Sequence, residues 1–386
     1  MKSSPGQPVR LLLAMHSFGQ SYMHVPGLLK RTGLPVDAVL TPNHPLRGVA
    51  GLSKTFVAGS AAGWAAAVEK HLLTGDYALL LNVDEPGLHA LYRHAWQPEA
   101  EKFLPLAKDS GAAATVGSKI AFHQWCLKNG LPVPETHVCA NLEEAVAVRR
   151  QLAGDWLLKG DSGSGGQSVM RFSPDGDSTV APDPECASWL VQRDEGRDVG
   201  SGIFLADHGR LLAWMGIRKI VCLDQGFGPT VFGRGDAAAD VGELCGRVAS
   251  ASGLTGLTGF DFVRGAGGSP LLIDSHLGRM SPMQHFDRLY GVDFASALRA
   301  WLLGESRHES APSHGGPPFI KFPEVLQLAV QGGLGRLLKE EGWRTASMPM
   351  SPPGDPFTGC RSACSTVISQ ARVNIGRWRR QIFPSP

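Results

Sequence analysis

The sequence lacks the features that mark membrane-spanning and secreted disulfide-rich proteins. No run approaches the ~18–20 apolar residues that span a bilayer, and no basic start with an apolar segment and cleavage site is present. Cysteine is scarce, with seven scattered residues in a chain of 386. The odd count without a paired framework indicates reduced thiols. We therefore expect a cytoplasmic protein.

An excess of charge of either sign is also absent. Lys and Arg total 37 against 35 for Asp and Glu, a net charge of +2. This balance argues against bulk binding of nucleic acid. Hydrophobic residues make up 43% and charged residues 19%, as in ordinary globular proteins. The length allows two or three domains with cores of their own.

The first third of the chain has no dinucleotide fingerprint but alternates apolar runs with helical stretches. Three runs have the length of buried strands: Val9–Ala14, Val36–Leu40 and Tyr77–Asn82. Continuous apolar runs between helices, such as the one expected over 61–73, favour a parallel sheet covered on both faces. The first run leads into Ser17-Phe18-Gly19-Gln20-Ser21 rather than G-x-G-x-x-G. We predict a doubly wound α/β domain over residues 1–112.

The middle of the chain has a mixed pattern, and we found no internal repeats. Helices are expected at 118–129, with Ser118 as N-cap, and at 142–152, 236–251 and 291–304. Strands are expected at 155–159, 168–172, 188–192, 200–206 and 210–216. The turn Asp207-His208-Gly209 predicts a hairpin between the last two of these strands.

Two segments in this region carry the chemistry. A strand ends in Lys159 and runs into Gly160-Asp161-Ser162-Gly163-Ser164-Gly165-Gly166. Backbone N–H groups of such a loop can cradle phosphate oxygens, and glycine permits the close approach. Later, two adjacent strands present Asp261 and Asp274, which repel unless a cation lies between them. A lysine, a glycine loop and paired acids predict a site for ATP and its metal.

An ordered series of motifs resembles the ATP-grasp superfamily. It comprises Ser118-Lys119, Lys159 with its loop, the segment 190–198, Asp261, and Asp274-Ser275-His276. The order and spacing are similar to the carbamoyl-phosphate synthase and biotin carboxylase branch and, more distantly, to D-alanine–D-alanine ligase. The resemblance implies an ATP-grasp domain of two α+β subdomains following the N-terminal domain. The expected limits are 113–306 for the domain, 113–196 for its lid side and 197–306 for its metal-bearing side.

The resemblance also implies roles for the matched residues. Those expected at the nucleotide are Lys119, Lys159, Ser162, Gly163, Ser164, Gly165, Gly166, Gln192, Arg193, Glu195 and Asp198. Lys159 is expected near the adenine and α-phosphate, and Asp198 at the ribose. Arg279 and Arg218, with Lys219 as the alternative to Arg218, are expected to stabilise charge on the transferring phosphoryl group.

The implied metal ligands are Asp261, Asp274 and His276, and here the chain departs from the family. The usual pattern is Glu-x-Asn followed by Pro and Arg, whereas this chain has Asp274-Ser275-His276-Leu277-Gly278-Arg279. His276 offers nitrogen where an amide oxygen is usual, which suits Mn²⁺ or Zn²⁺ better than Mg²⁺. We expect ATP with Mg²⁺, and Mn²⁺ as the alternative ion.

The activity that the resemblance implies is an ATP-dependent ligase that joins a carboxylate to an amine through an acylphosphate. Two alternatives stay open. One is a carboxylase-like enzyme that forms carboxyphosphate, although the chain lacks a biotin-carrier lysine motif and a glutaminase nucleophile. The other is a degenerate, non-catalytic nucleotide-binding protein, which the unusual Asp274-x-His276 sequence favours.

Candidate substrate residues follow from position alone. Ligands of open α/β sheets bind beyond the carboxyl ends of the strands. The side chains at those ends are His16, Ser17, Asp84 and Glu85, and His285 lies just beyond Arg279.

The last eighty residues give weaker signals. Residues 307–357 are rich in Ser, Gly and Pro and predict a linker region. Residues 358–386 predict an amphipathic helix with a basic face that includes Arg372, Arg377, Arg379 and Arg380. Packing on the body is the simplest role for this helix, and contact with an anionic membrane surface or an acidic partner is the alternative. The resemblance also leaves a homodimer open.

Overall fold

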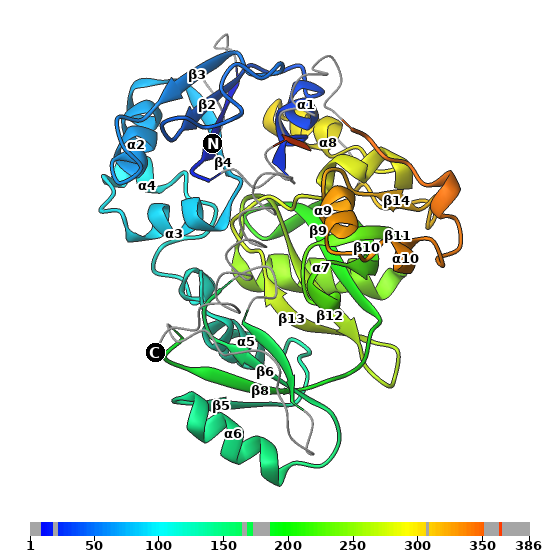
Figure 1. The fold of residues 1–386 in the computed structure, drawn as a ribbon. Coiled ribbons are helices and arrows are strands. Elements are labelled where there is room, and N and C mark those ends of the chain that lie inside the picture. The colour runs from blue at the N-terminus through cyan, green and yellow to red at the C-terminus, as the bar shows by residue number, and fades with distance from the viewer. Residues whose placement is uncertain are drawn as a thin grey trace, which may run out of the picture.

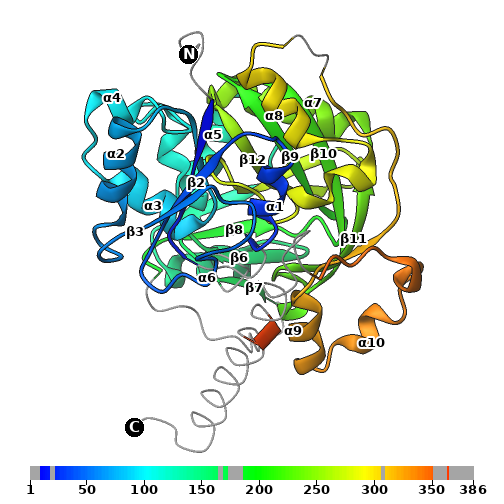
Figure 2. The same ribbon diagram turned by 90° about the horizontal axis from the view of Figure 1, so that it is seen from above.

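The computed structural model describes residues 9–17, 22–163, 168–172, 186–305, 309–350 and 363–364. These residues build three β-sheets with helices packed on them (Figures 1 and 2). Within this part of the chain, no helix has the length and hydropathy needed to cross a bilayer.

The N-terminal sheet is parallel, in the order β3-β2-β1-β4. Its strands are β1 (Arg10–Met15), β2 (Val36–Leu40), β3 (Lys54–Val57) and β4 (Tyr77–Asn82). Its helices are α1 (Val25–Lys30), α2 (Trp64–Thr74), α3 (Glu85–Arg93) and α4 (Pro98–Glu101). Leu12 and Leu80 pack with α2, α3 and α4, whereas Leu11 and Leu13 pack with α1 on the other face. Both faces are covered, which explains the continuous apolar runs and confirms the predicted doubly wound domain.

The second sheet is antiparallel, in the order β5-β8-β6-β7. Its strands are β5 (Thr136–Cys139), β6 (Trp156–Gly160), β7 (Val169–Phe172) and β8 (Trp189–Arg193). Helix α6 (Leu142–Gln151) covers one face through a small core around Trp156 and Trp189. The short η2 (Ala113–Thr115) and helix α5 (Lys119–Lys128) precede the sheet. As predicted, Ser118 caps α5, and its Oγ accepts from Ala121 N at 3.0 Å.

The third sheet has six antiparallel strands in the order β13-β12-β9-β10-β11-β14. They are β9 (Val199–Asp207), β10 (Arg210–Cys222), β11 (Thr230–Asp236), β12 (Gly256–Arg264), β13 (Pro270–Ser275) and β14 (Phe319–Ile320). One face is covered by α7 (Ala239–Ser252), where Leu244 and Val248 share a core with Phe204 and Phe260. The short η3 (Asp224–Gly226) lies between β10 and β11.

The N-terminal sheet and the six-stranded sheet share one hydrophobic core. That core joins Leu11 of β1 to Ile203 and Ile217 of the third sheet, with η4 (Gln284–Tyr290) and α8 (Phe294–Leu302) packed into it. At its rim, Arg31 Nη2 donates to both carboxylate oxygens of the fully buried Asp287 at 2.7 Å. These contacts fix the N-terminal strand ends relative to the third sheet.

Several expected elements need correction. Residue 236 ends strand β11 instead of starting a helix; Asp236 Oδ1 accepts from Ala238 N, and α7 begins at Ala239. Strand β10 extends to Cys222, six residues beyond the expected 210–216. Strands β3, β5 and β11 were not predicted. Two glycines in β11 weaken the pattern by which its sequence would indicate a strand.

The region 307–357 is more than a linker where the structure describes it. It contributes β14, which pairs with β11, followed by α9 (Glu324–Val330), α10 (Leu334–Leu337) and η5 (Trp343–Thr345). Phe319 is fully buried and stacks on Phe286 with ring centroids 4.2 Å apart. These elements extend from the β11 edge of the sheet (Figure 2). The predicted C-terminal amphipathic helix lies outside the described residues, except for Ala363 and Cys364, which are helical.

Candidate active site

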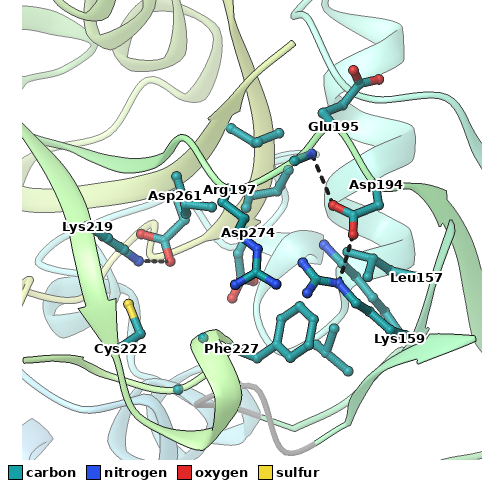
Figure 3. A pocket seen from close by; sticks show the side chains of 18 of the residues that line it. Leu157, Lys159, Asp194, Glu195, Arg197, Lys219, Cys222, Phe227, Asp261 and Asp274 are labelled. Carbon is teal, nitrogen blue, oxygen red and sulfur yellow. Dashed lines mark hydrogen bonds and ion pairs between the residues drawn. The ribbon is translucent and has the colours of Figure 1, made fainter. Parts of the chain in front are cut away.

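A cavity of about 390 Å³ lies between the second and third sheets. Strands β6, β7 and β8 supply one wall, and β10, β12 and β13 supply the other. Its apolar lining is Leu157, Val169, Val199, Ile220, Val221, Val263, Ile273 and Phe227. Its charged lining includes Lys159 and Asp194 on one side and Lys219 and Asp261 on the other, as Figure 3 shows. An apolar slot with charged groups at its sides suits a flat base attached to an anionic tail.

Lys159 enters the cavity from the end of β6. Its side chain is buried, and Nζ donates to Gln192 Oε1 on the neighbouring strand β8 at 2.5 Å. Gln192 is held in turn by Thr136, whose Oγ1 accepts from Nε2 at 3.1 Å. Burial lowers the pKa of Lys159 to about 8. The ammonium therefore has a neutral partner in a poorly solvated place, where an anionic ligand would stabilise its charge.

The acids lie opposite, on the paired strands β12 and β13. Asp261 and Asp274 are register partners, and one ligand atom from each, with one from His276, lies within 4.8 Å of the others. Asp261 accepts from Ser201 Oγ at 2.6 Å and from Lys219 Nζ at 2.5 Å. Lys219 and His276 hold the pKa of Asp261 well below its usual range despite burial. The structure thus brings together the three residues predicted as metal ligands.

The glycine loop is tied to the start of α5. Asp161 Oδ1 accepts from Ser118 Oγ and from Ile120 N, both at 2.8 Å. Lys119 Nζ donates to Gly163 O at 2.7 Å, so this second predicted lysine lies against the loop and lines the cavity. Gly163 has a φ of +101°, a conformation that favours glycine. The hydroxyl of Ser162 lies 3.4 Å from Cys186 Sγ. Residues 164–166 of the loop lie outside the described part.

The segment after β8 borders the cavity, but not with every predicted side chain. Glu195 is among the lining residues. Arg193 is also among them, although its guanidinium is exposed and lies 3.4 Å from Glu135. Asp198 pairs with Arg218 at 2.9 Å, and both line an adjoining open hollow with Arg234; Arg197, Lys219 and Ile220 line this hollow as well as the cavity. Of the two alternatives on β10, Lys219 therefore lines the cavity between the sheets, and Arg218 lines the hollow beside it.

A smaller cavity of about 30 Å³ adjoins the acids and reaches the N-terminal domain. Lys119, Gly163 and Asp274 line both cavities. The smaller one adds Arg279, whose Nη2 lies 3.7 Å from Glu85 Oε2, and whose Nη1 donates to Tyr22 OH at 3.2 Å. Burial is the largest influence on Arg279, but Tyr22 and Glu85 outweigh it and raise its pKa. A lasting cation beside Asp274 suits binding of a carboxylate or a phosphoryl group.

The other predicted substrate residues lie outside both cavities. Asp84 caps α3 by accepting from Gly87 N at 2.9 Å and binds His16 N at 2.8 Å, so its carboxylate holds backbone. His16 Nδ1 lies 3.1 Å from Ser17 Oγ, and its ring meets Trp64 edge-on. His285 stacks between His24 and Phe286, and burial keeps its pKa well below the usual value. Of this group, Glu85 lines the smaller cavity.

Sequence reasoning missed several lining residues. Arg171 of β7 donates to Asp194 Oδ2 at 2.9 Å, and its guanidinium lies 5.2 Å from the Phe227 ring centroid. Arg336 and Lys339 line the same cavity from α10 and the turn after it. Arg171 and Phe227 sit on elements with no motif, and the last two lie in the region predicted as a linker. No local pattern pointed to any of them.

No family model and no curated protein matches the sequence. Solved structures do match its fold. L-amino acid ligase from Bacillus licheniformis is 15% identical, with a TM-score of 0.57 over 79% of this chain and 78% of that one. Phosphoribosylamine–glycine ligase from Thermotoga maritima is 13% identical, with 0.58 over 79% and 78%. Biotin carboxylase from Campylobacter jejuni, solved as an ATP complex, is 11% identical, with 0.54 over 77% and 72%.

The chain has the ATP-grasp fold. Gly163 lines one side of the cavity between the second and third sheets, and the acid-bearing strands β12 and β13 line the other. The predicted resemblance is thereby confirmed at the level of the fold.

Proposed function

We propose that this protein is an ATP-dependent carboxylate–amine ligase that works through an acylphosphate. The observation that carries the proposal is the set of residues that line both cavities, Lys119, Gly163 and Asp274. The larger holds buried Lys159 opposite Asp261 and Asp274, and the smaller leads from Asp274 to Arg279 and to Glu85 of the N-terminal domain. A nucleotide site and a charged acceptor site therefore share one wall.

The nucleotide end is assigned by chemistry. The adenine is placed in the apolar slot, with the backbone between Gln192 and Gly196 along its edge. Lys159 and Lys119 hold phosphate oxygens, and Lys219 leaves Asp261 for the terminal phosphate. These cations neutralise and position the tail.

The residues present fit a divalent cation. Asp261 and Asp274 offer carboxylate oxygens. His276 Nδ1 is buried and has no hydrogen-bond partner among the described residues, so no hydrogen bond at Nδ1 keeps Nε2 from binding a cation. Asp261, Asp274 and His276 would hold the ion. A bound cation would neutralise charge on the phosphate oxygens.

The acceptor end follows from Arg279. A substrate carboxylate held there attacks the γ-phosphorus in line, and the bond from phosphorus to the ADP oxygen breaks. An amine then attacks the carbonyl carbon, phosphate leaves, and the amine proton passes to solvent. Arg279 positions the carboxylate and stabilises the charge that develops on the transferring group. Glu85 faces this guanidinium and is placed to receive a cationic or amino group.

Hydroxylamine trapping tests the proposal. With ATP, a divalent cation and a panel of carboxylates that includes amino acids, we expect hydroxamate formation matched by ADP release. Arg279→Met should abolish the signal, whereas Arg288→Met, a half-exposed arginine paired with Asp293, should retain it. ATP binding without hydroxamate from any carboxylate would favour the non-catalytic alternative. ADP release that depends on bicarbonate alone would favour the carboxyphosphate alternative.

A further inference from the structure

The third residue of the candidate metal site is His276, whose backbone is held by hydrogen bonds on both sides of its side chain. His276 N donates to Gly259 O at 3.1 Å, and His276 O accepts from Thr258 Oγ1 at 2.8 Å. The side chain is 11% exposed, and Nε2 lies 3.8 Å from Asp261 Oδ2, too far for a hydrogen bond. Nδ1 is buried and has no partner among the described residues. Nε2 therefore faces the Asp261 carboxylate without a hydrogen bond to it.

The carboxylates are positioned for the same point. Asp274 Oδ1 accepts from Ser275 N at 3.0 Å, which holds that side chain at the end of β13. Ser201 Oγ donates to Asp261 Oδ1, so the other oxygen, Oδ2, is the one that faces Lys219 and His276. Lys219 Nζ now satisfies Oδ2, and a dication would displace this ammonium. The displaced Lys219 ammonium would remain next to the cavity, where it could bind phosphate oxygens.

We propose that His276 makes this site prefer Mn²⁺ over Mg²⁺. Mg²⁺ prefers an octahedron of oxygen ligands and gives up water reluctantly. Imidazole nitrogen adds affinity for transition metals but little for Mg²⁺, whereas carboxylates serve both Mg²⁺ and Mn²⁺. Two carboxylates plus one imidazole therefore keep the oxygen ligands that suit a nucleotide-bound cation and add one ligand that favours Mn²⁺. The inference rests on the nucleotide end of the proposed function, and not on the acceptor.

Electron paramagnetic resonance on the full-length protein tests this directly. Mn²⁺ is added with a non-hydrolysable ATP analogue, and pulsed spectra report nitrogen nuclei bound to the ion. We expect a directly coordinated nitrogen, and its coupling should change to that of ¹⁵N when the protein is ¹⁵N-labelled while the nucleotide is not. Mg²⁺ should displace the Mn²⁺ only at an excess of about a hundredfold.

His276→Asn gives the matched variant, because it returns an amide oxygen to this position. It should lose the nitrogen coupling and reduce the Mn²⁺-over-Mg²⁺ preference by about tenfold or more. His137→Asn is the control, since that half-exposed histidine of β5 lies beside Glu135, away from the acids, and should change neither readout. Bound Mn²⁺ without protein nitrogen coupling, or equal displacement by Mg²⁺ in wild type and His276→Asn, would overturn the proposal. Binding is read without turnover, so a failed ligase assay leaves this result unaffected.

Discussion

The affinity for nucleotide should depend on pH near pH 8 because Lys159 titrates there, well below the usual range of lysine. Its side chain is 6% exposed, and its hydrogen-bond partner is the neutral Gln192 amide. Burial lowers the pKa of Lys159 from 10.5 to about 8. A difference of this size corresponds to about 3 kcal/mol of preference for the neutral amine, relative to a lysine in water.

The sign of the effect follows from proton counting. Between pH 8 and 10.5 the unfolded chain binds the Lys159 proton and the folded, nucleotide-free chain does not. The contribution of Lys159 to the free energy of unfolding therefore rises with pH across that window. A triphosphate beside Nζ favours the ammonium and opposes its deprotonation. The affinity of the nucleotide is then scaled by the protonated fraction of Lys159 in the free protein.

Calorimetry of ATP binding between pH 7 and pH 9 measures this effect. The protonated fraction falls from about 90% to about 10%, so the dissociation constant should rise about tenfold. At pH 8, titrations in buffers of different ionisation enthalpy should show uptake of about half a proton. Lys159→Arg is the matched control because its guanidinium stays charged, and its affinity should vary little with pH. The same pH slope in both proteins, or no proton uptake at pH 8, would refute the reasoning.

Three further predictions test other parts of the structure. Lys219→Met should weaken ATP binding about ten- to a hundredfold, whereas Arg218→Met on the same strand should change it by less than about twofold. Equal effects of the two substitutions would contradict the placement of these side chains. Arg336→Ala should raise the dissociation constant of ATP about two- to fivefold, and an unchanged value would remove α10 from the site. Arg31→Ala should lower the free energy of unfolding by about 3 kcal/mol in a urea titration, because Asp287 would stay buried without its cation; a loss below about 1 kcal/mol would argue against that ion pair.

The lysine side of the site was predictable because its signals are local. The apolar strand, Lys159 and the glycine loop are contiguous, and the Ser118 cap adjoins Lys119. The acids were predictable from their place on two successive strands, which the structure pairs residue against residue. Local pattern and motif order were sufficient wherever neighbours in sequence are also neighbours in the site.

The choice between Arg218 and Lys219 required the sheet. Successive residues of a strand face opposite sides, and a register shift follows Lys219 in its pairing with β11, so sequence alone could not tell which side chain meets the cavity. The position of Arg336 could not be predicted from sequence either. Its helix α10 follows β14 in the chain, and the pairing of β14 with β11 joins this region to the sheet. Asp84 lay where the strand-end rule expected it, but capping α3 engages its carboxylate with backbone.

Calorimetric titration of ATP into the purified protein tests the central claim most directly. It should be run with Mn²⁺, with Mg²⁺ and with a chelator, in wild type and in Asp274→Asn. We predict binding that requires a divalent cation and that weakens in Asp274→Asn, because the acid pair of β12 and β13 holds the ion beside the nucleotide. Binding that is indifferent to the cation and to Asp274, or no binding, would contradict a working nucleotide-and-metal site between the two sheets.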